Sequence, residues 1–172
     1  MAHAGPGNQL GRGFGDRANP RLWRTVAERF PLRISLGHLV NDAGAFVTAH
    51  DTPGSDLGCV WALQASPGLL DPTDTALKGQ VFGDLAYRPE LIDDPALRTR
   101  FFEVLRAVYG RNDPDLTRML YGTDWLMLGH ERHNARYFTA MQQGMTDARY
   151  TPRQIDNILW ANAHAFLSGV RP

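Results

Sequence analysis

Four short apolar segments of this chain each end in a side chain that can bind a metal ion or transfer a proton. The segments end in His3, His38, Asp84 and Asp124. Imidazole and carboxylate groups are common ligands of zinc-like ions and common general acids and bases. If the segments are strands of one parallel sheet, these side chains meet where the strands end. The sequence therefore predicts one polar site that contains His3, His38 and Asp124.

The spacing of these residues matches βα units, in which a strand, a helix and a second parallel strand follow one another. Consecutive members lie about 35 to 46 residues apart, which is enough for a parallel crossover. We therefore predict an α/β fold. Its parallel strands lie near residues 1–4, 33–38, 80–85 and 118–124, with helices between them. No linker or repeat divides the chain, so residues 1–172 are interpreted as a single domain.

Three helix starts are marked by a capping residue followed by proline, which suits the first helical position because its missing N–H would have no helical partner there. Apolar residues at helical spacing follow each pair, as in an amphipathic helix. A fourth helix is expected from about residue 132 to residue 144, whereas proline and glycine interrupt the pattern between 40 and 79. The marked starts are Asn19-Pro20, Asp94-Pro95 and Thr151-Pro152.

Composition argues against several classes of partner. The 18 basic residues are balanced by 18 acidic ones, so neither nucleic acid nor an anionic membrane is an expected partner. No apolar run approaches the ~18 residues of a membrane span. The first residues lack the basic and apolar regions of a secretory signal. The one cysteine, Cys59, cannot form an internal disulfide, which favours a cytoplasmic location.

Each candidate also has a structural explanation that the residues alone leave open. His38 is compatible with a hydrogen-bonded histidine at a strand end, and Asp124 with an aspartate that caps a turn or helix. His3 lies at a chain end, where the backbone commonly frays. Asp84 is interpreted as structural, because no motif assigns it a role.

Five segments, taken in order, resemble the second half of an amidohydrolase-superfamily barrel. The branch they resemble is the amidohydrolase-related one, which includes the aminocarboxymuconate-semialdehyde decarboxylase-like enzymes. The resemblance covers nearly the whole chain, and its most specific part is Gly-Thr-Asp-Trp followed by the final Asn-Ala helix. It implies a partial TIM (β/α) barrel made of strands five to eight with their helices. The segments are 1–5, 33–39, 81–86, 118–125 and 158–163.

The resemblance also implies a metal centre at the strand ends. His3, His38 and Asp124 would end strands five, six and eight. A divalent ion, zinc by the type of its ligands, would be held by His3 and Asp124, and would supply hydroxide at neutral pH. Asp124 would accept the proton of the metal-bound water. His38 would orient that water or polarise the substrate.

Three further residues are expected to contact the substrate. Tyr87 and Arg88 follow the strand near 80–85, and Trp125 follows Asp124 directly. Arginine is suited to a carboxylate, since its guanidinium can donate two parallel hydrogen bonds. The implied activity is metal-dependent hydrolysis of a C–N or C–O bond, or decarboxylation of a small carboxylated substrate.

The chain departs from the family pattern in two ways. A complete barrel takes roughly 250 residues, whereas this chain has 172. The His-x-His pair of the family's first strand is absent, and the segment from His130 to His133 has the wrong spacing. We therefore expect weak zinc binding or none. The alternative is a non-catalytic half-barrel remnant that forms a homo-oligomer or pairs with a missing N-terminal half.

Overall fold

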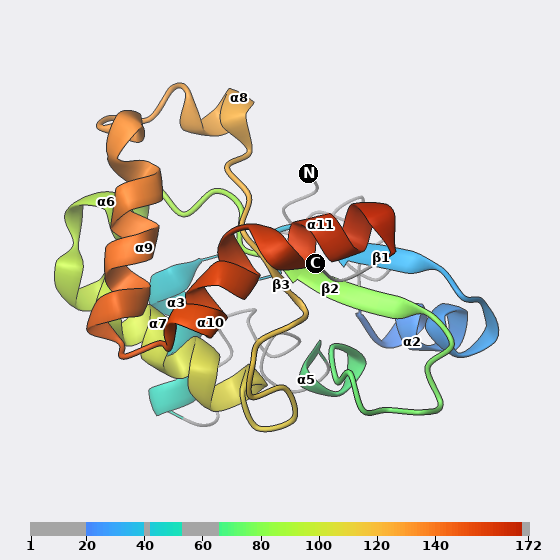
Figure 1. Cartoon of the computed structure of the whole chain (residues 1–172). Coiled ribbons are helices and arrows are strands. Elements are labelled where there is room, and N and C mark those ends of the chain that lie inside the picture. Colours follow the sequence, from blue (N-terminus) through green and yellow to red (C-terminus); the bar gives the residue numbers. More distant parts are fainter. Residues whose placement is uncertain (1–19, 40–41, 53–65, 170–172) are drawn as a thin grey trace, which may run out of the picture.

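The computed structural model describes residues 20–39, 42–52 and 66–169. Figure 1 shows the whole chain, with a short parallel sheet among helices. His3 and the strand expected at residues 1–4 lie outside the described residues, as does Cys59. That the chain forms a single domain stays a prediction.

Three parallel strands form the sheet, in the order β1-β2-β3. They are β1 (Arg33–Leu36), β2 (Gln80–Asp84) and β3 (Met119–Leu120). Leu36 pairs with Gly83, and Asp84 pairs with Leu120. The predicted α/β class and the parallel direction of these strands are confirmed, whereas a partial barrel is not shown and stays a proposal.

Helices precede, separate and follow the strands in chain order, and their starts match the marked starts where these can be compared. Asp94 caps a helix through a bond from the Leu97 N–H, and Thr151 forms a capping box with Gln154. The fourth expected helix begins at Tyr137, later than predicted, because residues 134–136 form a 3-10 turn first. The helical elements are α2 (Pro20–Arg29), α3 (Ala43–Asp51), α5 (Ser66–Leu69), α6 (Glu90–Asp93), α7 (Pro95–Tyr109), α8 (Trp125–Leu128), η1 (Asn134–Arg136), α9 (Tyr137–Asp147), α10 (Pro152–Asp156), the π-helix η2 (Asn157–Ala161) and α11 (Asn162–Ser168).

The central strand is buried on both faces. Val81 is 2% exposed and belongs to the main hydrophobic core, while Phe82, 1% exposed, points the opposite way because side chains alternate along a strand. The Phe82 ring meets that of Phe166 in α11, with centroids 5.4 Å apart. In Figure 1, α11 lies across the sheet. Both faces of β2 are therefore covered, as in α/β proteins.

Helix α7 is the centre of the main core. Its Phe101 and Phe102 are fully buried, and Phe46 of α3 packs on Phe101 with ring centroids 5.8 Å apart. On the other side, a Cβ atom added to Gly144 of α9 would lie 2.7 Å from Phe102. The two helices can approach this closely because residue 144 has no side chain.

The C-terminal helices hold β3 in place through hydrogen bonds to the backbone in and around the strand. Asn162 is fully buried, and its amide donates to the carbonyls of Leu116 and Met119 at 2.8 and 2.7 Å. The Ile158 carbonyl, in the π-helix, accepts from the Tyr121 N–H at 2.9 Å. A π turn shifts the helical hydrogen-bond pattern. The strand predicted at 118–124 is thus shorter, because Tyr121 bonds to a helix and not to the sheet.

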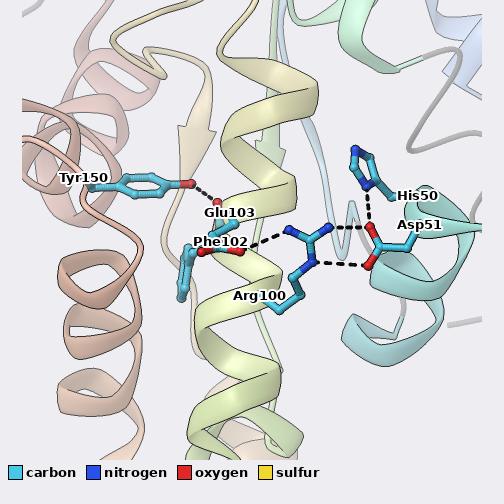
Figure 2. A network of polar contacts seen from close by, with 6 residues as sticks. All are labelled: His50, Asp51, Arg100, Phe102, Glu103 and Tyr150. Carbon is cyan, nitrogen blue, oxygen red and sulfur yellow. Dashed lines mark hydrogen bonds and ion pairs between the residues drawn. The ribbon is translucent and has the colours of Figure 1, made fainter.

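An ion-pair network joins α3 to α7 (Figure 2). The Arg100 guanidinium makes two hydrogen bonds to the Asp51 carboxylate and a third, of 3.0 Å, to Glu103. The Asp51 carboxylate also pairs with the His50 imidazole, with Nδ1 and Oδ1 2.9 Å apart. Arg100 first, and then His50, lower the pKa of Asp51 to about 2.

Replacing Arg100 with Gln tests this network. The pKa of Asp51 is lower in the folded chain than its ordinary value of 3.8. The stabilisation by the ion pair is therefore complete at a pH above 3.8, and it is lost as the pH falls through the lower pKa of the folded chain. We expect Arg100→Gln to lower the urea concentration at the unfolding midpoint near about pH 6. The difference in midpoint between variant and wild type should be smaller at about pH 3. Arg153→Gln, which removes an exposed pair with Asp115, is the control. A difference independent of pH would contradict the ion-pair explanation.

Candidate functional site

The carboxyl ends of the three strands bring two of the predicted site residues together. His38 lies two residues after β1, and Asp124 lies four residues after β3. The His38 Nε2 and Asp124 Oδ2 atoms are 3.3 Å apart, and their side chains are 16% and 23% exposed. The pair is thus partly desolvated but still open to solvent. His3 lies outside the described residues.

The backbone at these strand ends is left-handed. His38, Tyr87 and Asp124 have φ values of 51°, 55° and 47°. Residues other than glycine rarely adopt this conformation, at a cost of about 1–3 kcal/mol each, and such residues concentrate at functional sites. The described residues contain six of them, so half lie around this one cluster. Tertiary contacts therefore hold the backbone in conformations that these residues rarely adopt by themselves.

Asp124 occupies the N-cap position of α8, but its side chain does not cap the helix. The structural explanation for this residue was a capping role, in which the carboxylate accepts a backbone N–H of the first turn. No such hydrogen bond is formed. The carboxylate instead faces the His38 imidazole.

Asp84 joins the same cluster, although its sequence pattern suggested only a structural role. It is the last residue of β2, and it acts electrostatically on both His38 and Asp124. Its Oδ1 atom accepts a hydrogen bond from the Ala86 N–H at 2.8 Å. A Cβ atom at Gly122 would lie 2.5 Å from this oxygen, so only glycine fits there. The position of Asp84 at a strand end was the signal for its place in the site.

Burial and neighbouring charge oppose ionisation in this cluster. Burial lowers the pKa of His38, and the positive charge of Arg88 lowers it further, while Asp124 and Asp84 act in the opposite direction. Burial raises the pKa of Asp84, against the Ala86 N–H and the charges of His38 and Arg88. A neutral imidazole at physiological pH can accept a proton. The chemistry that the cluster can perform is therefore proton transfer.

Tyr87 and Arg88 line the cluster from the segment after β2. The rings of Tyr87 and His38 are 6.4 Å apart in an edge-to-face arrangement, and the Tyr87 hydroxyl donates to Glu131 Oε1 at 2.5 Å. Arg88 is completely buried, and its Nη1 donates to the Tyr87 carbonyl at 2.6 Å. Its backbone N–H donates to the Tyr137 hydroxyl at 3.2 Å. Tyr87 thus lies beside His38, and a substrate contact by Tyr87 or Arg88 stays a prediction.

Trp125 follows Asp124 on α8 and faces solvent. It is 74% exposed, and its neighbours Leu126 and Met127 are 60% and 48% exposed. In Figure 1, α8 stands apart from the sheet, next to α9. The Trp125 side chain is therefore available to a ligand or a partner and is not part of the core.

The described residues do not by themselves fit a complete metal site. A catalytic zinc ion takes three protein ligands, whereas no group of three or more His, Cys, Asp or Glu side chains able to hold a metal occurs among residues 20–39, 42–52 and 66–169. His38 and Asp124 offer two donors.

Two cavities lie away from the cluster. One, of about 260 Å³, is bordered by the segment 71–80 and Arg118, at the opposite ends of the strands. The other, of about 430 Å³, lies between the end of α3, Pro67 and the end of α7. Neither is lined by a residue of the His38 cluster, so neither supports the same chemistry.

Comparisons with protein-family models, curated proteins and solved structures found nothing that matches this chain. In the part of the chain that the structure describes, no helix is long and apolar enough to cross a membrane. The geometry of the cluster and the sequence motifs are therefore the evidence that bears on function.

The protonation of His38 can be tested by NMR titration of its imidazole. We expect Arg88→Gln to raise the His38 pKa, because a nearby positive charge is removed, and Asp124→Asn to lower it, because a stabilising negative charge is removed. Arg136→Gln, which changes an exposed arginine paired with Asp93, is expected to leave the titration unchanged. Shifts in the same direction for the first two variants would contradict this electrostatic account.

Proposed function

We propose that this chain carries the proton-transfer pair of a hydrolase or decarboxylase that acts on a small carboxylated substrate. The observation that supports it is the pairing of His38 with Asp124 across 3.3 Å at the carboxyl ends of a parallel sheet. This is the edge at which α/β enzymes bind ligands and perform chemistry. The resemblance to the amidohydrolase-related family supports the choice of reaction.

In hydrolysis, neutral His38 is the general base. Its imidazole takes a proton from water as the oxygen attacks the electrophilic carbon of a C–N or C–O bond. The Asp124 carboxylate stabilises the imidazolium that forms. His38 then returns the proton to the leaving nitrogen or oxygen as the bond breaks. General acid–base catalysis of this kind contributes about 10²–10⁴-fold in rate.

In decarboxylation, the same pair works in the reverse order. The substrate carbon keeps the electron pair of the bond to the departing CO₂. His38, which has first taken a proton from solvent, then supplies this proton to the carbon, and Asp124 stabilises the imidazolium and holds the ring in position. In both reactions one proton is transferred, and His38 is the residue that transfers it. The geometry of the pair is compatible with either.

The resemblance also implies a zinc-like ion held by His3 and Asp124. When bound, such an ion supplies a Lewis acid and lowers the pKa of its water to ~7. His3 lies outside the described residues, and the remaining donors are too few for a site of three ligands. The metal thus stays part of the proposal. The described residues are assigned proton transfer alone.

The function is tested with a panel of small carboxylated amides, esters and β-keto or aromatic acids, with and without added Zn²⁺ or Mn²⁺. We expect turnover of at least one substrate by the wild type. His38→Gln and Asp124→Asn are expected to reduce kcat about 10²-fold or more, because each removes part of the proton-transfer pair. The matched control is His133→Gln, an exposed histidine paired with Asp93. No turnover by wild type, or full activity in His38→Gln, would contradict the proposal.

An exposed apolar group favours the second candidate, a non-catalytic protein that associates with itself. Trp125, Leu126 and Met127 of α8 are 74%, 60% and 48% exposed, and Phe138 of α9 is 49% exposed. Exposed apolar side chains at neighbouring positions, as on α8, can form part of an interaction site. A second copy of the chain would cover this group and remove it from water.

Sizing experiments test this candidate. We expect the wild type to elute as a dimer or larger assembly, and Trp125→Glu combined with Met127→Glu to shift it toward the monomer, since a charge at an apolar interface is costly to desolvate. Leu167→Glu, at another exposed apolar position, is the control and should not dissociate the assembly. A monomeric wild type would exclude self-association through α8.

A further inference from the structure

Arg88 has a buried edge that lacks hydrogen-bond partners. The residue is 0% exposed. Its Nη1 atom donates to the Tyr87 carbonyl at 2.6 Å, but its Nε and Nη2 atoms have no hydrogen-bond partner among the described residues. Buried polar groups without partners are rare in folded proteins and call for an explanation. For a cationic guanidinium the cost of desolvation is high.

The unpartnered atoms form the edge of arginine that best matches a carboxylate. Nε–H and one N–H of Nη2 are parallel and lie in one plane, so they can donate to both oxygens of a carboxylate at once. We call this edge the Arg88 fork. A lysine at the same place would carry the charge but not the paired geometry. The unfilled fork therefore points to a planar anion as its partner.

Carboxylates of the chain itself lie near enough to act on Arg88, but they bond elsewhere. Glu90, Asp84 and Asp42 all influence Arg88 electrostatically. Each accepts a backbone N–H, from Ala43 at 3.0 Å, Ala86 at 2.8 Å and Ala45 at 2.7 Å, respectively. These bonds hold the start of α3 and the segment after β2. The nearby negative charges thus offset the Arg88 charge in part without filling its fork.

Arg98 shows what a structural buried arginine looks like in the same protein. It is 8% exposed, and its Nη1 donates to the carbonyls of Leu91 and Ile92 at 3.0 and 3.2 Å. These bonds satisfy carbonyls of α6, and among the described residues its buried Nε atom has no hydrogen-bond partner. Arg98 is therefore explained by the backbone that it caps. Arg88 makes one side-chain bond, to a carbonyl next to it in sequence, and is not explained in this way.

We propose that the Arg88 fork binds the carboxylate of the substrate, next to the His38–Asp124 pair. This inference rests on the proposed function, and it narrows the substrate class to molecules with a carboxylate close to the reacting carbon. Asp84 and Asp124 would repel an anion from His38 without a compensating charge. Arg88, which acts electrostatically on His38, supplies that charge. A carboxylate on the fork would then hold the substrate beside the imidazole.

The experiment measures thermal unfolding in sodium formate and in sodium chloride at equal ionic strength. Formate is the smallest carboxylate and is the probe because the fork is closed to solvent. At a concentration well above its dissociation constant we expect the wild-type midpoint to rise by about 2–4 °C or more relative to chloride. Arg88→Met should abolish the rise. Arg88→Lys, which keeps the charge but lacks the fork, should lose most of it.

Three further variants make the outcome decisive. Arg98→Met removes the other buried guanidinium and should keep the formate response. Arg136→Gln, an exposed arginine, should also keep it and serves if Arg98→Met fails to fold. His38→Gln is expected to respond to formate while losing activity. An equal rise in the Arg88 variants, or no rise in wild type, overturns the carboxylate site.

The same data separate this inference from the proposed function. A formate response that depends on Arg88, in a protein without turnover on any substrate, leaves the carboxylate site standing and rejects the enzyme. Turnover that depends on His38, with no effect of the Arg88 variants on formate binding or on KM, supports the enzyme and rejects the carboxylate site.

Discussion

The pairing of β2 with a parallel strand on each side is the constraint on which the candidate site depends. Because parallel strands present their carboxyl ends at one edge, the residues after β1, β2 and β3 meet there whatever their separation in sequence. Antiparallel pairing would have sent Asp84, at the end of β2, to the edge opposite His38 and Asp124. Burial of Val81 and Phe82 on the two faces of β2 stabilises this arrangement, since each face is covered by helices.

The site also depends on helices that lie far from it in sequence. β3 is two residues long, which is too short to be stable alone. Asn162 and the carbonyl of Ile158 hold the backbone on either side of it. A fully buried amide that bonds two carbonyls is costly to replace, because the carbonyls would be left unpaired. The C-terminal helices thus fix the position from which Asp124 reaches His38.

Electrostatics in the cluster follow from incomplete solvation. Burial favours the neutral forms of both His38 and Asp84, and Arg88 brings a positive charge into the same region. A chain optimised for stability alone would replace such groups with apolar ones, since buried charges are stabilising only when well paired. Their presence beside three strained backbone positions is the pattern expected of a site kept for chemistry.

The sequence by itself determined the local elements. Helix starts at Asp94 and Thr151 depend on capping side chains and prolines within a few residues, and such contacts need no tertiary partner. Strand-end motifs and their spacing were enough to predict parallel strands and the meeting of His38 with Asp124. Zinc binding by His3, the partial barrel and the proposed activity remain predictions.

Only the tertiary structure decided the rest, because it depends on contacts between distant residues. The close approach of Gly122 to the Asp84 carboxylate is a tertiary contact, which no periodicity reveals. The left-handed backbone at Tyr87 is a property of the folded chain. The unfilled fork of Arg88 arises from burial, which is set by which helices cover which strands. β3 is shorter than predicted because of a tertiary contact as well. The N–H of Tyr121, the residue after the strand, donates to the Ile158 carbonyl in a helix remote in sequence. Sequence patterns record local preference, whereas desolvation and strain are properties of the packed chain.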